Sequence, residues 1–171
     1  DNGLDYESDL FTYGGGIRME DNSNMALTHA TISDNSSYHG GGGISSYQSD
    51  TIILQDVIVS GHFVEGGTGF DHAGGGIKST DTKLILADVI VTGNSAASSG
   101  GGISIINSTN ADYIFKMNNV TISDNYSGGN GGGIDSNSPI IMTNCTITGN
   151  TAEWNGSGIN MGPEQNQIIV N

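Results

Sequence analysis

The tetrapeptide Gly14-Gly15-Gly16-Ile17 occurs five times in this 171-residue chain, and a variant, Gly156-Ser157-Gly158-Ile159, follows them. Successive copies are 25 to 33 residues apart, and the isoleucines of the five identical copies are Ile17, Ile44, Ile77, Ile103 and Ile134. A repeat of this length is typical of stacked-repeat proteins, in which one unit cannot bury its own apolar residues and packs against its neighbours. The sequence therefore predicts a solenoid, formed by a single domain that covers residues 1–171.

A nine-residue motif in each unit supplies the apolar residues of the expected core. One copy, LADVIVTGN, runs from Leu86 to Asn94, and four others align with it. Three apolar columns result: Leu27, Leu54, Leu86, Met117 and Met142; then Ala30, Val57, Val89, Val120 and Cys145; then Ile32, Val59, Val91, Ile122 and Ile147. Apolar and polar residues alternate and β-branched side chains are frequent, so the motif predicts a strand. Cys145 is expected to be an inert interior residue.

A bend is expected between the first and second apolar columns. The residue directly before the second column is His29, Asp56, Asp88, Asn119 or Asn144. Asn and Asp tolerate the left-handed backbone conformation that a sharp corner requires. The strand after each glycine run supplies a third side of the coil. The expected fold class is therefore all-β, a right-handed parallel β-helix of about six coils that are spaced about 4.8 Å apart.

The order of these elements is an apolar strand, Ser or Thr, Asp-Asn or Gly-Asn, a small residue and then Gly-Gly-Gly-Ile. It resembles the right-handed β-helix repeat of bacterial surface proteins, including the polymorphic outer-membrane protein repeats of autotransporter passenger domains. The resemblance covers nearly the whole chain. It implies an extracellular or cell-surface location and a structural or adhesive function. Related helices also serve as surface-layer components, polysaccharide lyases and hydrolases, so the fold alone does not decide the function.

The chain is strongly acidic, with 18 Asp and Glu residues, 4 Lys and Arg residues and a formal net charge of −14. Phosphate binding requires clustered Lys and Arg, so nucleic acid is not an expected partner. The acidity fits solubility in exposed surroundings or weak binding of divalent cations. No membrane span is predicted, because no apolar run is long enough, and the chain begins at Asp1 without a signal peptide. It is therefore expected to be a mature form or a fragment.

Two sequence features suggest metal ions, but neither is specific enough to predict a metal site. His39 and His72 each precede the isoleucine of a glycine run by five residues, so they are expected to lie above one another on adjacent coils. Residues 66–71 match the start of the calcium-binding nonapeptide GGxGxDxUx, but that motif binds ions between successive copies, and only one copy is present. No metal or other cofactor is predicted, and calcium is kept only as an additional partner.

A carbohydrate-active enzyme, either a polysaccharide lyase or a hydrolase, is one alternative function. Such chemistry needs clustered carboxylates, or a basic residue beside acids. Arg18 and Lys78 occupy the same position after the glycine run, but the coil between them has Ser45. Asp56 and Asp88 stack at the bend, where backbone hydrogen bonding explains them. No catalytic residue is therefore predicted.

An ice-binding solenoid is the other alternative. The outward residues that flank the third apolar column are mainly Thr and Ser, which form a ladder on one flat face. Ile58 and Ile90 interrupt this ladder midway. These two isoleucines suggest a patch that packs against another chain.

Six Asn-x-Ser/Thr sequons make attached glycans a further expectation for a secreted chain. Their asparagines are Asn35, Asn107, Asn119, Asn125, Asn144 and Asn155. The same pattern also arises where Asn at a bend is followed by a strand Thr, so these residues are candidates for glycosylation only.

The two ends of the solenoid are the predicted functional surfaces, because exposed strand edges and apolar residues need a cap or a partner. Residues 167–171 are expected to form the strand before a bend, and the N-terminal segment approximates the strand that should follow it. Completion of one copy's last coil by the next copy would produce a head-to-tail filament. Excision from a longer adhesin is the competing explanation. The predicted assembly residues are Leu4, Tyr6, Leu10, Ile168, Ile169 and Val170.

Overall fold

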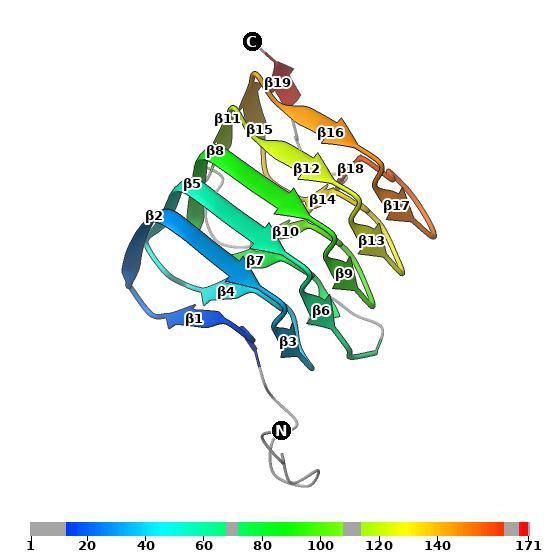
Figure 1. Ribbon diagram of the computed structural model, residues 1–171, viewed down its shortest axis with the longest axis horizontal. Helices are drawn as coiled ribbons and strands as arrows, with labels where there is room; N and C mark the ends of the chain where they lie inside the picture. The colour runs from blue at the N-terminus through cyan, green and yellow to red at the C-terminus, as the bar shows by residue number, and fades with distance from the viewer. Residues whose placement is uncertain (1–12, 68–71, 108–113, 163–167, 171) are drawn as a thin grey trace, which may run out of the picture.

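The computed structural model describes residues 13–67, 72–107, 114–162 and 168–170. The chain winds as a right-handed parallel β-helix, and its coils lie one above another from β1 to β19 (Figure 1). All strand pairs are parallel, and the described residues contain no α-helix. Sheet A contains the strands that follow the glycine runs: β1 (Ile17–Glu20), β4 (Ile44–Tyr47), β7 (Ile77–Thr80), β10 (Ile103–Ile106), β14 (Ile134–Ser136) and β18 (Ile159–Met161).

Sheets B and C complete each coil. Sheet B contains β2 (Asn24–Ser33), β5 (Thr51–Ser60), β8 (Lys83–Thr92), β11 (Phe115–Asn118), β12 (Thr121–Ser123), β15 (Ile140–Thr143), β16 (Thr146–Thr148) and β19 (Ile168–Val170). Sheet C contains β3 (Ser36–Ser37), β6 (Phe63–Val64), β9 (Ser95–Ala96), β13 (Tyr126–Ser127) and β17 (Thr151–Ala152). We number the coils from one, which contains β1, β2 and β3. Five coils contribute to all three sheets and the sixth to two, which confirms the predicted fold of about six coils.

The predicted apolar columns form the core of the tube. The first and third columns are paired in register along sheet B, and the isoleucines after the glycine runs are paired in register along sheet A. In the middle coils these side chains are fully buried, as Leu54, Val59 and Ile77 show. Each coil therefore buries its apolar residues only by contact with the coils above and below it.

The predicted bends are also present. The residue before the second apolar column has a positive φ in all five coils, between 52° and 59°. At this point β11 and β12 separate in coil four, and β15 and β16 separate in coil five, whereas β2, β5 and β8 run through the bend. A left-handed residue in a fixed place explains why Asn, Asp and His are found there and β-branched residues are not.

The glycine runs donate their hydrogen bonds in one direction only. At each of the five junctions between coils, all four N–H groups of the run bond to carbonyl oxygens of the next coil. For example, the N–H groups of Gly101 and Ile103 donate to the carbonyls of Gly131 and Gly133 at 3.1 and 2.9 Å. A Cβ on Gly101 would lie 2.5 Å from the Gly132 carbonyl oxygen, so the second position of the run admits only glycine when a further coil follows.

A ladder of four asparagines and one histidine, buried in coils two to four and half-buried at its two ends, runs from coil to coil near the start of sheet C. It contains Asn35, His62, Asn94, Asn125 and Asn150. The backbone N–H of Asn94 donates to Asn125 Oδ1 at 2.9 Å, and the backbone N–H of Asn125 donates to Asn150 Oδ1 at 3.0 Å. The Nδ2 atoms of Asn94 and Asn125 each donate to the next Oδ1 and to a backbone carbonyl of the preceding coil. Each of these two amides therefore joins three coils.

Coil two has a histidine in this ladder instead of an asparagine. The backbone N–H of Asn35 donates to His62 Nδ1 at 3.0 Å, and His62 Nε2 lies 3.0 Å from the carbonyl oxygen of Ile32. The proton of the neutral ring is therefore on Nε2. Burial lowers the pKa of His62 below 6.5, although the two backbone hydrogen bonds and the Asp34 carboxylate act in the opposite direction. The folded protein thus favours the uncharged ring.

Acid is expected to destabilise the protein through His62. Its pKa is lower in the folded than in the unfolded chain, so the stability it contributes is complete above about pH 6.5 and is lost as the pH falls toward the lower folded-state pKa. The loss is at most about 1.4 kcal/mol for each pH unit. Urea unfolding of the wild type and of His62→Asn at about pH 7 and about pH 5.5 tests this, because the variant restores the ladder residue and should lose this part of the pH dependence. Equal pH dependence in both proteins would contradict it.

Candidate functional site

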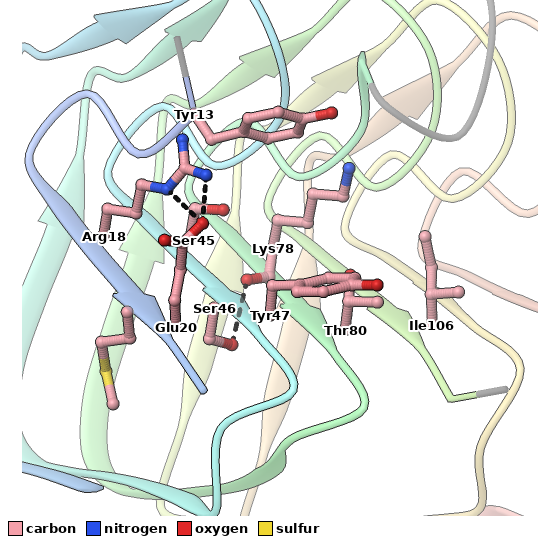
Figure 2. Close-up of a pocket in the computed structure, with 10 residues that line it drawn as sticks. Tyr13, Arg18, Glu20, Ser45, Ser46, Tyr47, Lys78, Thr80 and Ile106 are labelled. Carbon is pink, nitrogen blue, oxygen red and sulfur yellow. Dashed lines mark hydrogen bonds and ion pairs between the residues drawn. The ribbon is translucent and has the colours of Figure 1, made fainter. Parts of the chain in front are cut away.

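A pocket of about 440 Å³ lies on the outer side of sheet A at the first coils (Figure 2). Two registers of outward side chains form its floor. Arg18, Ser45 and Lys78 are paired on β1, β4 and β7, and two positions further along each strand come Glu20, Tyr47 and Thr80. Because Ser45 is small and lies between two long cations, the strand in the middle leaves a hollow. The pocket volume is within the usual range for small-molecule sites.

Two of the four Lys and Arg residues of this acidic chain line the pocket. The guanidinium carbon of Arg18 and the ammonium nitrogen of Lys78 each lie 5.1 Å from the ring centroid of Tyr13, although two strand spacings separate the residues. Such distances are those of cation–π contacts. Arg18 Nε also donates to Glu20 Oε1 at 2.9 Å, and the two side chains form an ion pair. Among the described residues that line the pocket, Arg18 and Lys78 are cationic and Glu20 is anionic.

An exposed aromatic ring completes the pocket. Tyr47 is 51% exposed to solvent, whereas Lys78 is only 5% exposed. Figure 2 shows the Lys78 side chain pointing toward the Tyr13 ring, with Tyr47 beside it. The arrangement combines a flat apolar surface, a cationic centre and small hydroxyl side chains in one hollow. The sequence showed that Arg18 and Lys78 occupy the same position after the glycine run. It did not indicate that Tyr13 and Tyr47 lie beside them.

The two histidines lie on adjacent coils, as predicted. The rings of His39 and His72 are stacked with centroids 4.8 Å apart and an angle of 27° between the planes. Tyr13 stacks on the other side of His39 with centroids 5.0 Å apart. Stacked rings direct their nitrogen lone pairs in nearly parallel planes, so they do not converge on a shared ion. Among the residues that the structure describes, no group of three or more His, Cys, Asp or Glu side chains is arranged to hold a metal.

Most of the partial match to the calcium-binding nonapeptide, and half of the predicted assembly residues, lie outside the described residues. Within residues 66–71, only Gly66 and Gly67 are described. Leu4, Tyr6 and Leu10 all precede Tyr13, where the description begins. Neither prediction is therefore tested by the structure.

The C-terminal assembly residues form strand β19 at the edge of sheet B. Ile168, Ile169 and Val170 pair with Ile140, Ile141 and Met142 of β15, so Val170 lies in the first apolar column. Ile168 and Ile169 are 42% exposed and Val170 is 72% exposed. The apolar column that is buried in the middle of the tube is thus open to solvent at coil six.

The segment that joins coils three and four matches a known protein family. Residues 88–106 match the Chlamydia polymorphic membrane protein repeat. This segment runs from the bend residue Asp88 through the ladder residue Asn94 and the glycine run to the end of β10. This segment is therefore similar to a polymorphic membrane protein repeat, in agreement with the resemblance inferred from the motif. No curated protein and no solved structure matches the chain.

The matched segment contains one copy of the bend residue, the ladder residue and the glycine run, which recur in the other coils. Of the residues that line the pocket, it contains only Ile106. The similarity therefore concerns the coil and not the hollow on it. None of the described segments forms an apolar helix of membrane-spanning length.

The sequon asparagines differ in accessibility. Asn119, Asn144 and Asn155 are exposed, and Asn35 and Asn107 are half-buried. Asn125 is only 1% exposed, and its Nδ2 donates to Asn150 Oδ1 and to the Val91 carbonyl. The folded protein therefore offers no accessible amide at Asn125, which is a ladder residue and not a surface sequon.

The acidic residues considered for catalysis have structural partners. Asn119 Nδ2 donates to Asp88 Oδ1 at 2.6 Å, and His29 Nε2 lies 3.4 Å from Asp56 Oδ2, so the residues of the bend bond to one another along the edge of the tube. Asp135 lies in the register of Arg18 and Lys78 but four and two coils away from them, respectively. Burial raises the pKa of Asp135, although hydrogen bonds from Asn160 and Ser99 act to lower it.

The outer face of sheet B carries the mixed column that the sequence indicated. Thr31, Ile58, Ile90, Thr121 and Thr146 are paired in register. Ile58 and Ile90 are exposed in the middle of this face, so the Thr ladder is interrupted where the tube is most regular.

Proposed function

We propose that this chain is a non-catalytic structural or adhesive β-solenoid of an extracellular surface, and that copies of it associate head to tail along the solenoid axis. The observation that carries the proposal is the exposed apolar edge of β19. Its residue Val170 continues a core column in which Leu54 and Leu86 are 0% and 1% exposed. Burying such an edge against a further strand satisfies backbone groups and apolar side chains together.

The direction of the glycine hydrogen bonds supports a head-to-tail orientation. Since every run donates toward the next coil, the N–H groups of Gly156, Ser157, Gly158 and Ile159 point away from the tube, and no described residue accepts from them. The corresponding carbonyl groups of the first run face the opposite end. Donors therefore meet acceptors when unlike ends approach, whereas two like ends would place donors against donors. Contacts between unlike ends repeat indefinitely and form a filament.

Ser157 limits how closely a second copy approaches at the glycine run. Its counterparts in the preceding coils include Gly42, Gly101 and Gly132, where a Cβ would lie 2.5 Å from a carbonyl oxygen of the following coil. Ser157 carries a Cβ at this position. The side chain thus occupies the space that the backbone of a seventh coil would need. The proposed contact is therefore centred on β19 in sheet B, and it is weak and reversible.

Sedimentation velocity of the full 171-residue chain at several concentrations tests this proposal. The wild type should form a concentration-dependent series of species, and Val170→Lys should raise the Kd of association at least about tenfold, because it places a charge in the contact. Ile58→Lys is the matched control, since it makes the same kind of change on the side of the tube. Ser157→Gly should strengthen association, and Val170→Lys should reverse that gain.

Two outcomes would refute the proposed association. One is a wild-type chain that stays monomeric at all concentrations while Ser157→Gly is also monomeric. The other is a loss of association in Ile58→Lys that equals the loss in Val170→Lys, because the contact would then lie on the lateral face of sheet B.

A further inference from the structure

Two exposed aromatic rings stand on the outer side of sheet C, with a small residue between them. Strands β6, β9 and β13 lie side by side along one edge of the tube (Figure 1). Their outward residues Phe63, Ser95 and Tyr126 are paired in register. Phe63 and Tyr126 are both exposed, and Ser95 is too small to cover either ring. We call Phe63 and Tyr126 the aromatic pair.

The next outward row beside the aromatic pair carries small residues and carboxylates. Burial alternates along each strand of sheet C, and the backbone hydrogen bonds between coils continue beyond the strands by one residue. The row that follows in coils two to five is therefore Glu65, Ala97, Gly128 and Glu153. The Tyr126 hydroxyl donates to Glu153 Oε1 at 2.6 Å, which fixes this ring. The aromatic pair thus has exposed carboxylates on the coils at its side and no large side chain on coil three between its rings.

The charge around the aromatic pair is negative. All four Lys and Arg residues of the chain lie on other sheets, two on sheet A and two on sheet B. Neither Glu65 nor Glu153 forms an ion pair with a described residue. The chain as a whole has a net charge of −14. Charge complementarity therefore favours a cationic ligand, because this surface repels anions.

The spacing of the aromatic pair favours a wide organic cation. Two strand spacings, about 9.6 Å, separate the strands that carry the two rings, so a cation centred over Ser95 is about 4.8 Å from the line of either strand. Aromatic faces attract a cation within about 6 Å of the ring centre. A trimethylammonium group has apolar methyl groups that reach both rings, whereas a primary ammonium or a small metal ion holds its water strongly.

We propose that the aromatic pair binds a small organic cation with a trimethylammonium group, of the choline type. The methyl groups pack between Phe63 and Tyr126 above Ser95, and the carboxylates of Glu65 and Glu153 supply the opposite charge. The hydrogen bond to Glu153 positions the Tyr126 ring before the ligand arrives. The site lies on the side of the solenoid, so it does not depend on axial association.

Titration of the full 171-residue chain with choline chloride at constant ionic strength, followed by saturation-transfer NMR and calorimetry, tests the proposal. Choline should bind with a Kd of about 1 mM, the range for a ligand of this size. The alcohol 3,3-dimethyl-1-butanol has the shape of choline without its charge, and it should bind at least about fivefold more weakly. Phosphocholine brings a phosphate toward the carboxylates, so it should also bind more weakly than choline.

Three results of these titrations would overturn the proposal. Dimethylbutanol that binds as tightly as choline would show that charge has no part in recognition. Tighter binding of phosphocholine would point to an anion site. Tighter binding of the neutral disaccharide cellobiose would show that the aromatic pair is a surface for sugar rings.

Variants that fill the space between the rings locate the site. Ser95→Leu leaves both rings and both carboxylates in place, and it should weaken choline binding at least about tenfold, because the new side chain occupies the space of the methyl groups. Ser36→Leu is the matched control, since Ser36 is exposed in the same register on coil one, outside the aromatic pair. It should bind like the wild type. Unchanged affinity in Ser95→Leu, or an equal loss in Ser36→Leu, would exclude the site.

A second pair of variants removes aromatic rings. Phe63→Ser should weaken choline binding at least about fivefold, and the fold should remain, because the ring is exposed. Tyr47→Ser removes an exposed ring from sheet A, and it should bind choline like the wild type. If both variants lost affinity equally, or if neither did, the aromatic pair would not be the binding site. Circular dichroism confirms that each variant is folded.

Discussion

Gly101→Ala is expected to lower the free energy of unfolding by about 3 kcal/mol or more, which corresponds to a fall of about 6 °C or more in Tm for a chain of this size. The added Cβ would lie 2.5 Å from the Gly132 carbonyl oxygen and still closer to that of Tyr126. Both obstacles are backbone atoms, so no rotamer change relieves the overlap. The run of coil four must then move away from coil five, which weakens its hydrogen bonds to that coil. Thermal and urea unfolding, followed by circular dichroism, measure the effect.

Gly67→Ala is the control for this prediction. Among the described residues, no atom lies within 4 Å of a Cβ added at Gly67, so the same substitution should change the free energy of unfolding by less than about 0.5 kcal/mol. Gly132→Ser provides a second comparison, because it places in coil five the residue that coil six already has as Ser157. If Gly132→Ser were as stable as the wild type, the second position of the run would not require glycine, and the explanation of Ser157 as an obstacle to a further coil would fail.

Asn125→Ala is expected to destabilise the protein by about 3 kcal/mol or more, because it leaves several buried polar groups without partners. The Asn94 backbone N–H and Asn94 Nδ2 both donate to Asn125 Oδ1, at 2.9 and 3.0 Å. Asn125 Nδ2 also donates to the Val91 carbonyl at 3.0 Å. Alanine satisfies none of these groups, and water does not reach a site that is 1% exposed. The midpoint of urea unfolding should fall clearly.

Asn118→Ala is the appropriate comparison, since Asn118 is an exposed asparagine of the same coil. It should have a stability within about 0.5 kcal/mol of the wild type. A result in which Asn118→Ala and Asn125→Ala are equally stable would mean that the amide ladder contributes little, and that apolar packing alone holds the coils in register.

The fold could be predicted from the sequence because, at each repeated position, the geometry of the coil restricts which residue types fit. Leu86 and its counterparts must face the lumen, and Asp88 and its counterparts must adopt a left-handed conformation, so their identities repeat with the coil. The structure confirms both the columns and the positive φ values. The strand expected near the C-terminus is also present as β19, in which Val170 pairs with Met142 of the first column.

The amide ladder could have been found in the same way, because its asparagine repeats with the coil, but at this position the sequence suggested only candidate glycosylation sites, at Asn35 and Asn125. The signal was the position of His62, which replaces Asn in an otherwise constant column. The pocket was harder to predict. Tyr13 lies before the first strand and Tyr47 at the end of β4, so neither repeats, and only the winding of three coils brings them to Arg18 and Lys78. Non-repeating residues on a repeating frame carry no periodic signal.

The glycine runs also make the molecule electrically unsymmetrical. In an ordinary sheet the peptide dipoles of a strand alternate and nearly cancel. Here the N–H groups of four consecutive residues point the same way at each of five junctions, so their dipoles add along the axis. The tube therefore has a partial positive pole at coil six and a negative pole at coil one, as an α-helix has at its two termini, although it contains no helix among its described residues.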